Sequence, residues 1–530
     1  HFDGDAVEHL SVFVTQADAA GRTTASYPYS TTAEGDFVFL GVAVGPFDLT
    51  AQDYQFGLTA EVAGTIAAVQ VPVVLPVHLP ATGTLEVTVD SAGAACTDAC
   101  NVALASEGQF DLTEYSYDGR TFGFDRVVVG AYVVQAVEGP TSLRTSARGV
   151  LSAPGEAQRV HLDVPATASI SGRVRHADGT PVTYGSLVLV GLDNDGPLGP
   201  FKTYGRVASD GRYSLSDIPV GRVRVAVPAD ASAASTPTAG YVDATLTTSG
   251  LPGADVTMGN AYSLPATLTG ADGFAYQTAC DGMGQVGGYP GDDLKVQGGW
   301  FGCQDAGVAA TDRTVSLGPS ALGTLVVTRK VFVPAGGGFA RYLELLSNPG
   351  AAPVTTRIGV ESDFSYSSDP TDVGVTTVPG ATSNTYAVAG NASWEAAYVF
   401  GGPDATVRAV VAGLVTGTAS FESDWDVTVP PGGTVAVMHF TVQRAPGDTA
   451  GAEAQAQALV GLADPNALAG LSPEERAEVV NFHVPAGTDQ VSALATDAGP
   501  PAARIEVVPD TALLRLTPEE KSQVATFLIP

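Results

Sequence analysis

Apolar and polar residues alternate with a period of two over most of the first 445 residues. Between Ala168 and Arg175, for example, Ala, Ile, Gly and Val occupy one face while Ser and Arg occupy the other. Side chains that alternate in this way lie on opposite faces of a strand, one against a core and the other in solvent. Turn signals such as Asp178-Gly179 and Asp210-Gly211 separate the runs at short intervals. The pattern predicts an all-β chain of tandem antiparallel β-sandwich domains.

An internal repeat consists of a glycine, an alternating run, a second glycine and another alternating run. The three copies occupy residues 35–51, 119–136 and 211–227, and their second glycines are Gly45, Gly130 and Gly221. These glycines lie 85 and 91 residues apart, a period that fits one small sandwich per repeat. The phrase Pro-Ala-Thr recurs at residues 80 and 165 and marks the joints. We therefore expect small sandwiches at residues 1–81, 82–166 and 167–260.

The third copy carries a family resemblance. SGRVRHADGTPV (171–182) and DGRYSLSDIPVGRVRVAV (210–227) resemble the carboxypeptidase regulatory-like domain, a seven-stranded prealbumin-like sandwich. Residues 167–260 match best, whereas residues 1–166 keep the glycine-strand-glycine core. Such domains are usually accessory or structural modules of bacterial cell-surface or secreted proteins, and they carry no catalytic residues. The resemblance therefore implies a fold and no activity.

Residues 261–445 predict a larger, immunoglobulin-like β-sandwich. TLVVTRKVFVP (324–334) and FARYLELLSN (339–348) have the length and composition of long strands, and VPPGGTVAVMHFTV (429–442) is similar to the closing strands of such domains.

Residues 446–530 differ in character and predict a short α-helical and linker segment. The Ala-rich stretch 450–462 predicts a helix, and LSPEER (471–476) is echoed by LTPEEK (516–521). Each copy places Ser or Thr before Pro and Glu at the third helical position, the pattern of a capping box. Between the copies, Gly499-Pro500-Pro501 marks a linker, and the strand-like Ile505–Val508 follows it.

The four cysteines fall into two local pairs, Cys96 with Cys100 and Cys280 with Cys303. An even number in matched pairs predicts two disulfides and an oxidising compartment. Zinc is the alternative, but three residues separate Cys96 from Cys100, where zinc motifs have two, and no histidine lies nearby. The cysteines predict a protein that is secreted or on the cell surface. His1 in place of an initiating methionine indicates either a processed mature form or a segment of a longer chain.

Acidic residues gather in sequence stretches that predict loops. The turn Leu192–Gly196 contains Asp193, Asn194 and Asp195, which are candidate ligands for Ca²⁺ because this ion prefers oxygen donors. A solvated turn is the alternative, since no acidic residue follows at the bidentate position. Two further acidic groups contain Glu361, Asp363, Asp369 and Asp372, and Glu422, Asp424 and Asp426.

The three tryptophans, Trp300, Trp394 and Trp425, are candidates for stacking on a sugar ring. Asp424 beside Trp425 would offer a carboxyl group next to an aromatic ring, as in a glycosidase. In a strand, however, Asp424 and Asp426 share one face as solvated acids. No nucleophile elbow, zinc-protease motif or phosphate-binding loop occurs. We therefore predict no catalytic residues.

The chain has 56 acidic and 25 basic residues, giving a formal net charge of −31. Such a surface repels phosphate groups, which argues against a nucleic-acid partner and against docking on anionic lipid. The longest apolar stretch, 65–79, contains Pro72 and Pro76, so it predicts an edge strand and not a membrane helix. We expect no membrane insertion.

These features predict a non-enzymatic extracellular protein with a structural or adhesive role, such as a subunit of a filament or stalk. Open strand edges favour head-to-tail self-association, and a surface glycan or protein is the other class of partner. The alternative is a carbohydrate-binding or accessory module of a secreted enzyme, using the sandwich at 261–445. Apart from calcium, we expect no cofactor.

Overall fold

The computed structural model describes residues 10–485 apart from short internal segments, and the fold is that of this part of the chain. Besides 1–9 and 486–530, the segments left out are 18–22, 34, 69–72, 92–93, 97–99, 107–108, 117–120, 140, 194–195, 229–238, 280–283, 287–288, 291–292, 298, 303–307, 312, 364–373, 378–384, 391–394 and 416–419. The chain divides into one unit of residues 1–484 and a second of 485–530. Within the described part, no helix has the length and apolar character that crossing a membrane requires.

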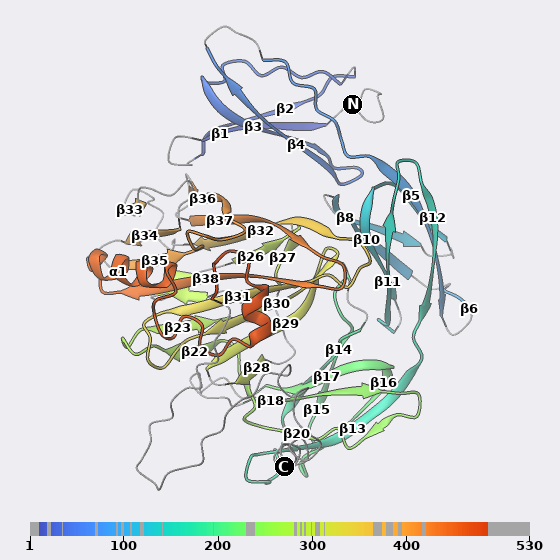
Figure 1. Ribbon diagram of the computed structural model, residues 1–530. Coiled ribbons are helices and arrows are strands. Elements are labelled where there is room, and N and C mark those ends of the chain that lie inside the picture. The colour runs from blue at the N-terminus through green and yellow to red at the C-terminus, as the bar shows by residue number, and fades with distance from the viewer. Residues whose placement is uncertain are drawn as a thin grey trace, which may run out of the picture. The chain divides into compact units, whose positions relative to one another are not determined.

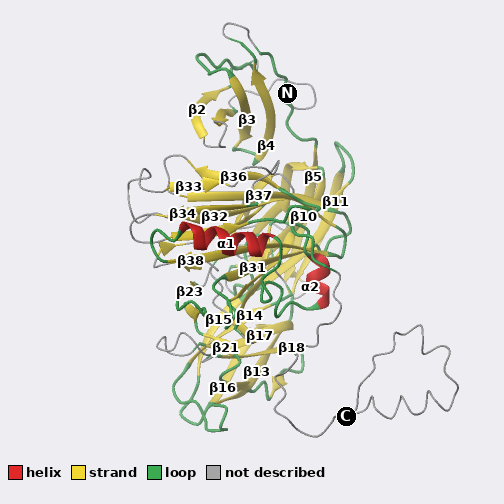
Figure 2. Cartoon of the chain, turned by 60° about the vertical axis from the view of Figure 1, so that its left-hand side comes forward, coloured by secondary structure: helices red, strands yellow, loops and turns green. Residues whose placement is uncertain are grey.

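Strands dominate the described residues and only two short helices occur, which confirms the all-β prediction (Figures 1 and 2). Nearly all strand neighbours are antiparallel. The parallel pairs involve the first strand of a repeat: β5 (Thr82–Ser91) pairs with β12 (Ala157–Val164), and β13 (Thr167–Arg175) pairs with β19 (Leu251–Pro252) and β20 (Val256–Thr257).

The first repeat contributes four strands to a single layer in the order β4-β3-β1-β2. These are β1 Ser11–Ala17, β2 Thr23–Ser30, β3 Gly45–Asp53 and β4 Leu58–Ile66. Alternate residues of β1, β3 and β4 are buried on one face. The edge strand predicted over 65–79 is wrong for most of its length, because β4 ends at Ile66 and residues 73–79 form no strand.

The second repeat is a complete two-layer sandwich. One layer has the order β11-β10-β7-β8, and in the other β5 lies between β12 and β9, with β6 at its end. The remaining strands are β6 Ala94–Ala95, β7 Cys100–Ser106, β8 Gln109–Ser116, β9 Thr121–Val128, β10 Gly130–Glu138 and β11 Arg144–Leu151. A single residue pair, Leu58 with Gln109, connects β4 to β8.

The third repeat has the same plan, with β15-β14-β17-β18 in one layer and β16-β13 with β19 and β20 in the other. Its other strands are β14 Ser186–Gly191, β15 Lys202–Arg206, β16 Arg212–Pro219, β17 Gly221–Val227 and β18 Gly240–Leu246. In all three repeats the second glycine adopts a positive φ, 141° at Gly45, 142° at Gly130 and 130° at Gly221. Only glycine adopts this conformation readily, which explains why the residue recurs.

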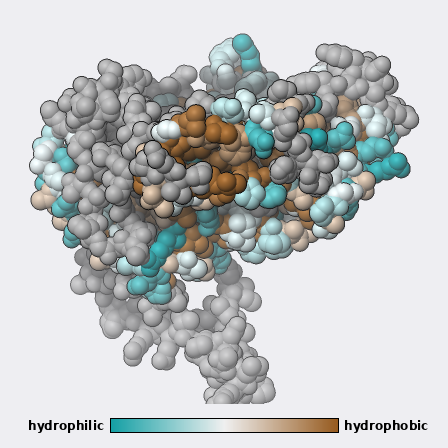
Figure 3. Space-filling model, turned by 90° about the horizontal axis from the view of Figure 1, so that it is seen from above, coloured by the Kyte–Doolittle hydropathy of each residue, from teal (hydrophilic) through white to brown (hydrophobic). Residues whose placement is uncertain are grey.

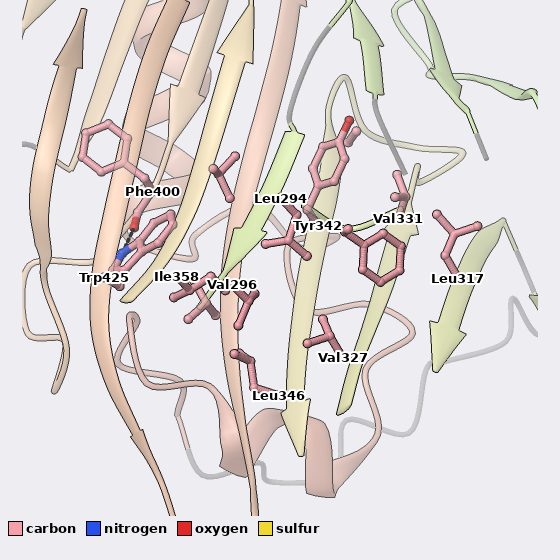
Figure 4. Close-up of a cluster of buried hydrophobic side chains, with 14 of the residues drawn as sticks. Leu294, Val296, Leu317, Val327, Val331, Tyr342, Leu346, Ile358, Phe400 and Trp425 are labelled. Carbon is pink, nitrogen blue, oxygen red and sulfur yellow. Dashed lines mark hydrogen bonds between the residues drawn. The ribbon is translucent and has the colours of Figure 1, made fainter. Parts of the chain in front are cut away.

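Residues 261–445 form a larger sandwich whose main layers are β21-β28-β29-β30-β31-β38-β35-β34-β33 and β27-β26-β32-β37-β36, with a small sheet β22-β23-β24-β25 beside them. The strands are β21 Ala261–Tyr262, β22 Ala266–Thr269, β23 Ala275–Thr278, β24 Gly284–Val286, β25 Tyr289–Pro290, β26 Asp293–Val296, β27 Gly299–Trp300, β28 Val308–Thr311, β29 Thr314–Leu322, β30 Leu325–Phe332, β31 Ala340–Ser347, β32 Val354–Asp363, β33 Gly374–Thr377, β34 Tyr386–Gly390, β35 Glu395–Val399, β36 Ala409–Val415, β37 Ser420–Val429 and β38 Thr434–Arg444. Side chains such as Val296, Tyr342, Ile358 and Trp425 fill the core (Figure 4).

The predicted helices begin the C-terminal segment and pack on the large sandwich. α1 (Thr449–Val460) buries Leu459, and α2 (Pro473–Glu478) starts with the predicted capping box between Ser472 and Glu475. After α2 the chain runs alongside β38, where the fully buried Asn481 accepts from the backbone N–H of Met438 and donates to its carbonyl. The first copy of the duplicated motif is therefore part of the sandwich core, and the second copy lies outside the described residues.

Candidate functional site

The N-terminal sheet presents an apolar face. Its inward side chains are Leu10, Val12 and Val14 near or on β1, Phe47, Leu49 and Ala51 on β3, and Leu58 and Ala60 on β4, and all of them are buried. In the other small sandwiches a second layer of strands covers the equivalent face. In the first repeat the cover consists of two segments, 36–44 and 73–79, and neither forms a strand.

A groove of about 810 Å³ lies between this face and the two covering segments. Its rim carries large apolar side chains in solvent: Val38 is 61% exposed, Leu40 85% and Val74 88%. Asp36 is the one charged residue that lines it among the described residues. Figure 3 views the molecule from the top of Figure 1, where β1–β4 lie, and shows a contiguous hydrophobic patch. Exposed patches of this kind mark interaction sites more often than chance.

The repeat explains the groove. Phe37 and Phe39 correspond to Phe122 and Phe124 of β9, which lie 85 residues further on. In the second repeat those two phenylalanines are 3% and 2% exposed and lie opposite Val87 and Leu85 of β5. Phe37 and Phe39, in contrast, are only half-buried.

Residues 73–79 correspond in the same way to β12. Val77 and Leu79 are buried like Leu162 and Val164, and the positions between them are exposed in both segments. In the second repeat β5 lies between β9 and β12 and pairs with both. The groove is therefore the place that the central strand of the second layer occupies in the other repeats.

The predicted calcium turn is engaged in an ion pair. The carboxylate of Asp193 accepts from Nε of Arg222 at 2.6 Å and from the backbone N–H of the same residue at 2.5 Å. Asn194 and Asp195 lie outside the described residues. Calcium binding through Asp193 would require it to leave Arg222, since the guanidinium group already compensates its charge.

Cys96 and Cys100 form the predicted disulfide, with Cα atoms 6.3 Å apart. Cys280 and Cys303 lie outside the described residues, so the second disulfide stays a prediction.

The three tryptophans have different surroundings. Trp425 has no exposed surface and its Nε1–H donates to the carbonyl of Phe400 at 3.2 Å, so in this structure it is not available to a sugar ring (Figure 4). Trp300 is 49% exposed on β27, and Nζ of Lys295 lies 5.4 Å from its ring centroid. Trp394 lies outside the described residues.

The expectation that Asp424 is a solvated acid is wrong, because its side chain is buried on β37. Burial raises the pKa of Asp424 to about 7, and Glu422 on the same strand adds to the shift. Burial also raises the pKa of Glu422, which lies directly opposite Glu361. Asp426, in contrast, is half exposed and pairs with Arg357 at 2.9 Å. The structure does not describe the side chains of Asp363, Asp369 and Asp372.

A buried charged network crosses the middle strands of the large sandwich. Glu344 accepts from Nε2 of His439 at 2.9 Å and lies 3.1 Å from Nε of Arg329. The ring of Tyr342 stacks on His439 with centroids 4.7 Å apart. Arg329 and Glu344 have no exposed surface, and the cavity beside His439 measures about 10 Å³, which is room for one water at most. Because this cavity has no room for a substrate, the described geometry of the network is that of a structural element of the core.

Sequence reasoning missed one group that could hold a metal ion. Asp90 on β5 and His161 and Asp163 on β12 place a ligand atom each within 4.8 Å of one another. The parallel register sets Asp90 beside Asp163, and Nδ1 of His161 lies 3.0 Å from the hydroxyl of Thr88. His-x-Asp on a strand puts both side chains on one face, which is the signal in the sequence, but the partner strand could not be predicted.

No known protein family model matches the chain, and no curated protein is similar to it. Among solved structures it is similar to a Streptococcal ancillary pilin, with 10% identity over 47% of this chain and 92% of that one, at a TM-score of 0.22. The minor pilin GBS52 of Streptococcus agalactiae has 11% identity over 33% of this chain and 94% of that one, at a TM-score of 0.23. BcpA, the major pilin subunit of Bacillus cereus, has 12% identity over 48% and 96%, at a TM-score of 0.14. At these values the likeness carries no argument about this chain.

Proposed function

We propose that this chain is a non-enzymatic structural subunit of an extracellular or cell-surface assembly, and that its copies associate through the N-terminal sandwich. The observation that carries the proposal is the open groove, which lies where the other repeats have a central strand. A sandwich that lacks such a strand exposes apolar surface and offers backbone on both sides of the gap.

The form of the groove favours a strand over a small molecule. It runs along two segments, 36–44 and 73–79, whose side chains alternate inward and outward as in strands. A strand that enters such a gap gains main-chain hydrogen bonds from both neighbours and places alternate side chains in the core, as in β-strand addition generally. A contact between unlike surfaces of identical subunits does not have to close, so it can generate a filament.

The positions of the buried ionisable side chains support a structural role. The Arg329–Glu344 pair has no exposed surface, and Asp424 is buried on β37, on the face opposite to the core residue Trp425. Neither lines the N-terminal groove, whose only charged residue among the described ones is Asp36.

The test is the mass of the purified full chain, measured by light scattering over a range of concentrations and followed by electron microscopy. We expect the mass to rise with concentration and the particles to be linear. Leu40→Glu with Val74→Glu at the groove rim should reduce association at least tenfold. Tyr184→Glu replaces an exposed aromatic residue elsewhere and should leave it unchanged. A strictly monomeric chain at every concentration would contradict the proposal.

A second candidate function is binding of a carbohydrate through Trp300, the exposed tryptophan on the edge strand β27. Sugar rings stack on exposed aromatic faces, and a groove beside such a face is the usual arrangement. A glycan array probed with the full chain and with Trp300→Ala tests it. Equal signals from both proteins would remove this candidate.

A further inference from the structure

The central strand that is absent from the described part of the N-terminal sandwich has a fixed place in the other two repeats. Leu85, a core residue of β5, precedes Leu104 by 19 residues, and Ile170 of β13 precedes Leu189 by the same number. Val14 is the counterpart of Leu104 and Leu189, because each of the three lies opposite the residue four positions after the second glycine of its repeat. Among the described residues of 10–81, none lies in the place that Leu85 and Ile170 occupy in their sheets.

The strands that fill this place share a sequence pattern. Just before the second repeat, Pro80 is followed five residues later by Leu85, a core residue of β5. Just before the third repeat, Pro165 precedes Ile170 by the same distance. From its core residue onward, the second repeat continues Leu-Glu-Val-Thr-Val-Asp.

The C-terminal tail contains the same pattern a further time. Pro500 is followed five residues later by Ile505, and residues 505–510 are Ile-Glu-Val-Val-Pro-Asp. Compared with Leu85–Asp90, four of the six positions keep the residue or exchange leucine for isoleucine. The tail therefore resembles the beginning of β5 from Ile505 to Val508, and the strand ends before Pro509, which takes the place of Val89 and has no N–H to donate.

We propose that residues 504–508 of one copy insert into the N-terminal groove of a second copy and form a central strand there. This inference rests on the proposed function and names its partner: an extended apolar segment of the same chain. The inserted strand runs antiparallel to residues 36–42 and parallel to 73–79, as β5 runs relative to β9 and β12.

The repeat also fixes the register. Because Leu85 lies opposite Phe124 and Val87 opposite Phe122, Ile505 lies opposite Phe39 and Val507 opposite Phe37. The two inward side chains of the tail then cover the two half-buried phenylalanines.

The residue between these two inward positions faces outward. Glu86 lies opposite Gly123 on β9 and Arg159 on β12, so Glu506 lies between Val38 and Val74.

Insertion into a second copy would repeat, between two molecules, the succession of strands seen between neighbouring repeats of one molecule. In residues 82–260 the last long strand of one repeat, β12, is followed within three residues by the central strand of the next, β13. Each sandwich thus receives its central strand directly after the preceding sandwich ends. A tail strand that follows the large sandwich and enters the N-terminal sandwich of the next copy repeats this order across the junction. The contact is heterologous, so it propagates head to tail.

Cysteine cross-linking of the full chain tests the register. Opposed residues of antiparallel strands have Cα atoms about 4.5–5.5 Å apart, within the range that a disulfide spans. Val38→Cys protein is mixed with Glu506→Cys protein under mild oxidation, so that only a link between two copies can form. We expect disulfide-linked dimers at a yield at least tenfold above that of Tyr54→Cys mixed with Glu506→Cys. Tyr54 is equally exposed at 64% but lies in the turn between β3 and β4.

A matched pair of tail variants tests the inward positions. Ile505→Asn with Val507→Asn places two amides in the groove and should reduce association at least tenfold. Val508→Asn makes a similar change at the next outward position, where β5 has Thr88, and should leave association unchanged.

The outcomes separate the occupants of the groove. If the tail inserts into its own molecule, the mixed single variants give no dimer and a Val38→Cys/Glu506→Cys double variant forms an internal link, which overturns the proposal. If a segment upstream of residue 1 fills the groove, neither link forms, which overturns it as well. If the unsubstituted chain associates but the tail variants do so equally well, the tail assignment fails while the structural function stands. If the unsubstituted chain stays monomeric, both fail.

Discussion

Replacing Asp424 with Asn is expected to flatten the pH dependence of the stability of the large sandwich. Burial raises the pKa of Asp424 to about 7, whereas an aspartate in an unfolded chain titrates near 3.9. Between these two pH values the folded state binds more protons than the unfolded state. The free energy of unfolding therefore falls as the pH rises from about 4 to about 7, and the contribution of this group is constant above that.

The size of the effect follows from the shift. A difference of about three pKa units at about 1.4 kcal/mol each gives roughly 4 kcal/mol for this carboxyl group. The raised pKa of Glu422 acts in the same direction, because that side chain is also buried beside like charge. Asn has nearly the shape of Asp and no charge, so the Asp424→Asn variant should lose about 4 kcal/mol less than the unsubstituted chain between pH 4 and 8.

The assay is urea unfolding at several pH values, followed through the fluorescence of Trp425 beside the substituted residue. Trp300→Phe and Trp394→Phe in both proteins make Trp425 the only reporter. Asp426→Asn, at a half-exposed position, serves as the control. If the Asp424→Asn variant and its parent lose the same free energy from pH 4 to 8, the reasoning from burial is refuted.

Two further substitutions test the core of the large sandwich. Glu344→Gln leaves Arg329 buried without its counter-charge and should cost about 3–5 kcal/mol in urea unfolding. Asp426→Asn breaks the exposed pair with Arg357 and should cost less than about 1 kcal/mol, so equal costs would contradict the assignment of the buried pair. Asn481→Ala removes the hydrogen bonds that join the segment after α2 to Met438 of β38 and to the carbonyl of Phe400, and it should cost roughly 3 kcal/mol. An unchanged unfolding midpoint would show that this segment does not stabilise the sandwich.

The fold class could be predicted from the sequence because period-two alternation is a local signal. The glycine of each repeat was visible for the same reason: Gly45, Gly130 and Gly221 are required by a positive φ that other residues avoid. The capping box at Ser472 likewise depends only on residues three positions apart.

The candidate site could not be predicted in the same way because it depends on pairing between distant strands. Phe37 and Phe39 alternate like Phe122 and Phe124, so the sequence does not reveal that β5 has no counterpart among the described residues of the first repeat. That difference appears only when the strand pairs are known.

The buried network was missed for a related reason. Arg329 falls in phase with Val327 and Val331, which places it on the inward face, but a charged residue in that phase is expected inside only when a partner is known. Glu344 supplies the partner from the neighbouring strand.

Hydrogen–deuterium exchange of the full chain at low and high concentration tests the central claim most directly. In an incomplete N-terminal sandwich, the backbone amides of residues 37–42 and 73–79 exchange rapidly when the protein is dilute. Insertion of a tail strand from a second copy pairs these segments, so we predict that their exchange slows at least about 100-fold at high concentration and stays fast in the Ile505→Asn/Val507→Asn variant. Exchange that is equally slow at both concentrations, or unaffected by the tail substitutions, would contradict the account.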